Sequence, residues 1–207
     1  MTSTSGAAPQ VPRPRIQGLS DLIFGLALSI GAIQLVGNLP QTHNGLVTDL
    51  SGFAFSFLIL ISVWNRYSTT MSVMPVETTQ LVRLNMLLLF LVAVEPFLFN
   101  VLVIRGLGSA IGAEVSEYYS LDIGGMNLVQ AYFVHVLASE EKNLIPRDLI
   151  RRYKAIRNLL LLTTAIFVAS DIPVFWSITL SGLPLRVLLW VLTIPVIWTS
   201  RLFGKRA

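Results

Sequence analysis

The sequence predicts an all-α, polytopic membrane protein. Of its 207 residues, 54% are hydrophobic and only 13% are charged, whereas about a quarter of the residues of a soluble domain are charged. Dense apolar runs such as 87–104 and 159–169 recur along the chain, and a helix needs roughly 20 mostly apolar residues to cross a bilayer. These runs are longer than barrel strands and do not alternate in polarity, so helices are the only spanning structure left.

Six segments, separated by stretches rich in turn-forming residues, are expected to be transmembrane helices. They lie at about 17–38, 46–66, 82–104, 115–138, 155–175 and 184–203. The fourth carries Asp122, Asn127 and His135, so it should face protein or line a wet cavity. Residues 1–14 are rich in Ser, Gly and Pro and are predicted to be a disordered tail. Residues 15–207 then form one six-helix transmembrane domain.

The basic residues support this count, because short cytoplasmic loops collect Lys and Arg. With six spans both termini lie on one side, and 13 of the 15 basic residues fall on that side. Only Arg105 and Arg186 fall on the other. We therefore predict a multi-pass protein of a cell membrane with both termini in the cytoplasm, and the net charge of +4 is assigned to anchoring at the lipid surface rather than to nucleic acid.

The first predicted helix carries a narrow apolar stripe. At about 100° per residue, Leu22, Leu26, Ile30 and Ile33 share one face, and Ser29 lies beside it. Such a stripe fits ordinary helix packing as well as a pore lining. The start of this helix is polar. Asp21 lies about 140° from Leu26 around the helix, so this acid points toward the bundle and needs a partner there. Ser and Asp near a helix start also fit simple capping.

The segment RIQGLSD, residues 15–21, resembles the Arg-x-x-x-Phe-Ser-Asp signature of the transmembrane protein 175 family of potassium channels. Arg15, Ser20 and Asp21 match the signature, and Leu19 stands where the family has Phe. The chain resembles a single-repeat, prokaryotic-type member of that family.

Three further segments carry the same resemblance at matching intervals. They are SFLILISVWNRY (56–67), RLNMLLLFLVAVEPF (83–97) and RRYKAIRNLLL (151–161). The resemblance implies a homotetramer whose first helices line a central pore for potassium ions.

The resemblance also implies roles for individual residues. The family narrows its pore with apolar side chains that correspond here to Leu26, Ile30 and Ile33, and its selectivity-linked Thr corresponds to Ser29, which keeps the hydroxyl and loses the methyl group. Leu22 belongs to the same predicted lining. Hydrophobic rings gate a pore by width and dewetting.

In the family, the signature polar residues bond to groups on the second and third helices. The matching positions are Trp64 and Asn85, so a structural network of Arg15, Ser20, Asp21, Trp64 and Asn85 is implied. The family's His after the second-helix Trp is Tyr67 here. Such a network would hold the pore helix at a fixed rotation.

Other functions find less support in the sequence. No nucleophile elbow, phosphate-binding loop, paired-His zinc motif or dinucleotide fingerprint occurs, so neither an enzyme nor a cofactor or metal site is expected. The chain has no cysteine. The alternative to a channel is a secondary transporter with its binding site on the polar fourth helix, for which inverted repeats and broken helices would be the expected signs.

Overall fold

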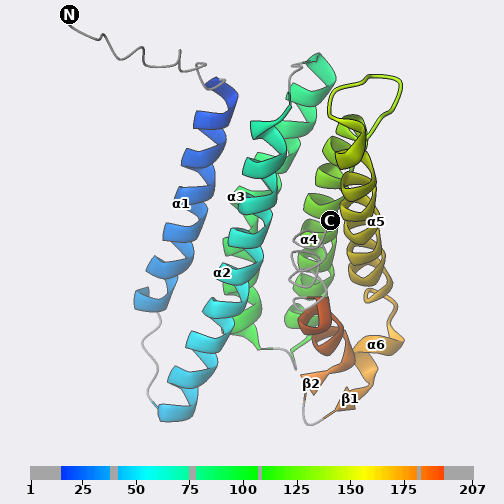
Figure 1. Ribbon diagram of the computed structural model, residues 1–207. Helices are drawn as coiled ribbons and strands as arrows, with labels where there is room; N and C mark the ends of the chain where they lie inside the picture. Colours follow the sequence, from blue (N-terminus) through cyan, green and yellow to red (C-terminus); the bar gives the residue numbers. More distant parts are fainter. Residues whose placement is uncertain (1–14, 38–41, 75–77, 107–108, 181–182, 194–207) are drawn as a thin grey trace, which may run out of the picture.

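The computed structural model is a bundle of long helices (Figure 1), and it describes residues 15–37, 42–74, 78–106, 109–180 and 183–193. The elements follow in the order α1 (Arg15–Gly37), α2 (His43–Ser72), α3 (Thr79–Arg105), α4 (Ala110–Leu137), α5 (Arg147–Ala169) and α6 (Val174–Ser177), then the strands β1 (Thr179–Leu180) and β2 (Leu183–Pro184). Residues 185–193 are again helical. The tail predicted at 1–14 and residues 194–203 of the predicted sixth span lie outside the described residues.

Short polar residues begin three of the helices. The hydroxyls of Thr42, Thr78 and Ser109 accept hydrogen bonds from the backbone N–H three residues further on, which satisfies one of the donors left open at a helix start. Gly106 follows the end of α3 with a φ of 74°, in the region that favours glycine. The predicted breaks before α2, α3 and α4 therefore each end at a side-chain cap that starts the next helix.

The long helices pack around two hydrophobic clusters: the larger involves α1 to α5 and the last helical segment, and the smaller lies between α4, α5 and their connection. α1 lies against α2 and α3, and α4 is packed between α3 and α5, so α1 and α5 lie at opposite edges of the view in Figure 1. Ring contacts connect the elements, because Tyr119 of α4 packs against Phe99 of α3 and against Trp190 of the last helical segment. A small antiparallel hairpin, in which Thr179 pairs with Pro184, joins α6 to that segment.

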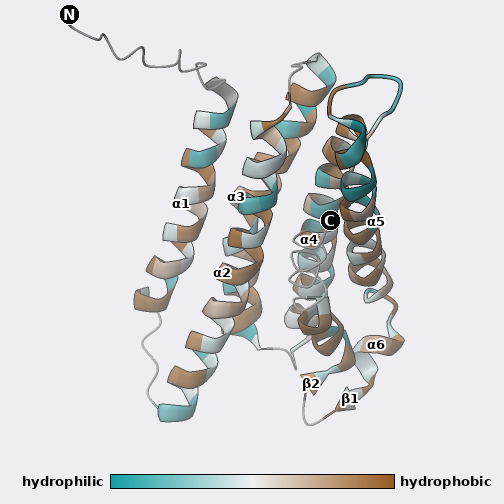
Figure 2. Ribbon diagram, in the orientation of Figure 1, coloured by the Kyte–Doolittle hydropathy of each residue, from teal (hydrophilic) through white to brown (hydrophobic). Residues whose placement is uncertain are grey.

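Five of the predicted spans correspond to α1–α5, and the predicted all-α class is confirmed apart from the short hairpin. Among the described residues, α1, α2 and α3 are long and apolar enough to cross a membrane by length and composition. α4 is too polar for this criterion, and α5 is basic over its first turns and apolar beyond them (Figure 2). Six spans in each subunit stay a prediction.

Candidate ion pathway and its polar network

The polar start of α1 is bonded to α2 and α3. Ser20 is fully buried, and its hydroxyl oxygen lies 2.7 Å from the hydroxyl oxygen of Tyr67 on α2. Asn85 of α3 donates a hydrogen bond from Nδ2 to the same Ser20 oxygen at 3.2 Å. The structure thus joins three helices at one serine hydroxyl.

A second bond lies one residue further along α1. The indole Nε1–H of Trp64 donates to Oδ1 of Asp21 at 3.0 Å. Phe24, one turn further, is buried against the ring of Tyr67, with ring centroids 5.7 Å apart. Four of the five residues predicted for the network are therefore brought together, with Tyr67 as an added member; the side chain of Arg15 lies outside the described residues.

The apolar stripe lies on the opposite face of α1. Leu22, Leu26, Ile30 and Ile33 are 68%, 57%, 37% and 67% exposed in the single chain, whereas Ser20, Phe24 and Ala27 are buried against α2 and α3. Ser29 is exposed beside the stripe, and its hydroxyl donates to the carbonyl of Gly25 one turn earlier at 2.8 Å. One face of α1 is thus committed to its own bundle, and the stripe is left for lipid or for another chain.

The structure also contains buried polar contacts outside the predicted network. Glu95 of α3 is fully buried, and its Oε1 accepts hydrogen bonds from Ser56 of α2 and Tyr119 of α4 at 2.8 and 3.2 Å. Arg66 of α2 donates to the amide oxygens of Gln130 and Asn127 on α4, both at 3.0 Å. The amide side chains of the polar fourth helix therefore bond α4 to α2.

Arg186, predicted as an outer basic residue, is another such contact. It is 1% exposed and donates from Nε to the carbonyl of Ser170 at 2.7 Å and from Nη2 to that of Asp171 at 3.2 Å. It also bonds Ser116 of α4 and lies over the ring of Trp176. The described residues hold no cluster of three or more His, Asp or Glu side chains suited to a metal ion.

A family model described as "Endosomal/lysosomal potassium channel TMEM175" matches residues 15–96. The predicted resemblance to the TMEM175 family is confirmed. The matched region contains α1, α2 and most of α3, and all ten of the predicted pore and network residues lie within it. No curated protein gives a significant match.

Two solved structures share the fold of the TMEM175-like chain. A lysosomal potassium-selective channel TMEM175 homolog from Chamaesiphon minutus is 20% identical, with a TM-score of 0.63 over 90% of this chain and 96% of that one. A variant of the potassium channel MtTMEM175, solved with a nanobody fusion protein, is 19% identical, with a TM-score of 0.65 over 99% of both chains. The fold therefore extends beyond the residues that the family model matches.

The contacts of Ser20 with Tyr67 allow a direct test of the network. Ser20→Ala should lower the free energy of unfolding by about 1–3 kcal/mol, because it leaves buried polar groups without a partner. In a double-mutant cycle with Tyr67→Phe, a coupling of about 0.6 kcal/mol, and up to roughly 1.7, is expected from hydrogen bonds between membrane helices. Thermal unfolding of the wild type, both single variants and the double variant in one detergent measures the loss of stability and the coupling. Ser29→Ala is the matched control, because its hydroxyl bonds only its own helix among the described contacts; equal coupling in both cycles would contradict the network.

Proposed function

We propose that the chain forms a potassium-selective channel in a cell membrane, as a homotetramer whose four α1 helices line a central ion path. The single observation that carries this proposal is the two-sided character of α1. One face bonds and packs within the subunit through Ser20, Asp21 and Phe24, and the other presents a continuous row of exposed aliphatic side chains. The family and both structural relatives are described as potassium channels.

The chemistry of this path would be that of hydrophobic rings. Four copies of Leu26 around an axis offer no oxygen ligands, so a narrow ring excludes water and every ion with it. A small rotation or outward shift of α1 widens the ring and admits partly hydrated potassium before the more strongly hydrated sodium. Ser29, one turn along and beside the stripe, supplies hydroxyl oxygens to the water around the ion.

The polar network gives α1 a defined rotation about its axis. Ser20 lies about 120° and Asp21 about 140° from Leu26 around the helix, in opposite senses, so bonds at both residues hold the stripe away from α2 and α3. Rotation of α1 would strain both sets of bonds. The network thus supports a role in setting whether Leu26 or Ser29 faces the ion path.

Reconstitution into planar bilayers tests the function. A channel gives single-channel steps and a reversal potential set by the potassium gradient. A carrier, the alternative with its site on α4, gives saturable flux that requires a coupled ion. The bond of Asn127 to Arg66 favours the channel, because it occupies one of the side chains on α4 that a substrate would need. Stepless, saturable transport would overturn the proposal.

The proposed orientation has its own test, made simple by the absence of cysteine. Lys142, between α4 and α5, and Thr179, in β1, are both exposed, and these two segments lie at opposite ends of the bundle in Figure 1. With both termini in the cytoplasm, Thr179→Cys should react with a membrane-impermeant maleimide in intact cells, whereas Lys142→Cys should react only after permeabilisation. The cysteine-free parent chain is the control for background labelling. The reverse pattern would invert the topology.

A further inference from the structure

A groove of about 500 Å³ opens between α3, α4 and α5, away from α1 and its stripe. Its rim is polar and includes Gln80 of α3, His135 of α4 and Arg157 of α5. Its walls are apolar and include Leu87, Leu128 and Leu161, each about half exposed. Neither the pore stripe nor the polar network of α1 uses any of these residues.

The polar and apolar residues of the groove lie at different depths. Along α3, Leu87 follows Gln80 by seven residues, or about 10 Å of helix rise. α4 runs in the opposite direction, and its Leu128 lies about the same distance below His135. On α5, Leu161 is one turn beyond Arg157. All three helices therefore carry the polar residue toward the basic end of the bundle and the leucine toward its middle, as the colours of Figure 2 show for α5.

The rim presents hydrogen-bond donors side by side. Arg157 Nη1 lies 3.2 Å from Nδ1 of His135. A guanidinium has only donors, so Nδ1 accepts this bond and the N–H donor of the ring is Nε2. Arg157 also donates to the amide of Asn158; within the described residues it forms no salt bridge, and no carboxylate lines the groove. The rim thus places one cation, Arg157, beside the imidazole of His135, without an acidic partner in that part of the chain.

We propose that this groove binds an anionic phospholipid, with the phosphate at Arg157 and His135 and an acyl chain along Leu87, Leu128 and Leu161. An amphiphile fits this arrangement, because its charged headgroup would lie at the polar rim and its apolar chain along the leucines nearer the middle of the bundle. Basic pockets between membrane helices on the cytoplasmic side recognise anionic headgroups in the same way. The proposal rests on the orientation that places this end in the cytoplasm, but not on ion conduction.

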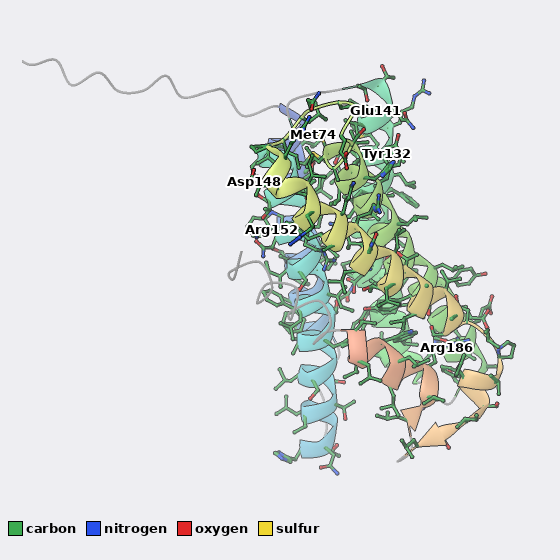
Figure 3. All side chains as sticks on the ribbon, turned by 45° about the vertical axis from the view of Figure 1, so that its right-hand side comes forward. Met74, Tyr132, Glu141, Asp148, Arg152 and Arg186 are labelled. Carbon is green, nitrogen blue, oxygen red and sulfur yellow. The ribbon has the colours of Figure 1, made fainter. Side chains whose placement is uncertain are left out.

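Native mass spectrometry of protein extracted from bilayers with equal phosphatidylglycerol and phosphatidylcholine tests the site. The wild-type chain should retain phosphatidylglycerol preferentially, and Arg157→Gln should retain roughly fivefold less, the loss expected for one basic residue at an anionic surface. Arg157→Lys keeps the charge and should keep most of the preference. Arg152→Gln is the matched control, because Arg152 is exposed on α5 and does not line the groove. In Figure 3 it lies on the other side of α5 from Tyr132 of α4, which does line the groove.

Two further arms separate the lipid from other occupants. Leu128→Trp fills the apolar wall and should reduce retention even though the rim is intact, whereas soluble glycerol phosphate should not displace the lipid. Equal retention by wild type and Arg157→Gln would overturn the proposal. Displacement by glycerol phosphate would show a simple anion site, and a groove covered by a second copy of the chain would retain no lipid; either result would also overturn it. Circular dichroism confirms that each variant is folded, and the readout is independent of potassium flux.

Discussion

Replacing Leu26 by alanine is expected to raise potassium conductance and to lower selectivity over sodium. The substitution removes three carbon atoms from each copy of a side chain that is 57% exposed on the free face of α1. In a ring around a symmetry axis, this widens and hydrates the narrowest segment, so the barrier for every ion falls. A barrier lowered by about 1.4 kcal/mol would give a tenfold larger conductance. Ile30→Ala, one turn further along, should act in the same direction.

Single-channel recording in bilayers with potassium on one side and sodium on the other measures both effects. Leu162→Ala is the matched control, because Leu162 is comparably exposed, at 53%, but lies on α5. Its conductance and reversal potential should equal those of the wild type. If Leu26→Ala and Ile30→Ala leave the currents unchanged, the stripe contacts lipid or other helices and the ion path lies elsewhere.

The apolar stripe of α1 and the signature residues can be predicted from the sequence, because each depends on one helix or on one short motif. The angular order of Leu22, Leu26 and Ile33 follows from the helix repeat alone. The need of Asp21 for a partner follows from the cost of a charge in a membrane. The partner itself, Trp64, came from the family resemblance, and its bond to Asp21 is present in the structure.

The contacts between distant helices could not be predicted in this way. Arg66 ends the predicted second span, where a basic residue usually anchors to lipid headgroups. Nothing local therefore indicates that it reaches Asn127 and Gln130, more than 60 positions away. Hydropathy also averages over a window. It therefore registers neither the first turns of α5, which are helical but basic, nor the short hairpin of β1 and β2.

The C-terminal part of the bundle should depend strongly on Arg186. Arg186→Met is expected to lower the free energy of unfolding by at least about 3 kcal/mol, since two or more hydrogen bonds from a charged donor contribute roughly 1.5–3 kcal/mol each. The methionine side chain fills similar space but leaves the carbonyls of Ser170 and Asp171 and the hydroxyl of Ser116 without their donor. Scanning fluorimetry in detergent measures the change in midpoint.

Two further variants serve as controls for the Arg186→Met prediction. Arg186→Lys keeps the charge but lacks the planar fork that reaches several acceptors at once, so it should recover only part of the lost stability. Arg105→Gln removes a charge from an exposed residue with none of these contacts among the described residues and should change stability by less than about 0.5 kcal/mol. Because Arg186 joins α4, the end of α5 and the last helical segment rather than α1, potassium flux below the unfolding temperature should persist in Arg186→Met. A midpoint equal to that of the wild type would mean that the buried guanidinium contributes no net stability, as some buried ion contacts do.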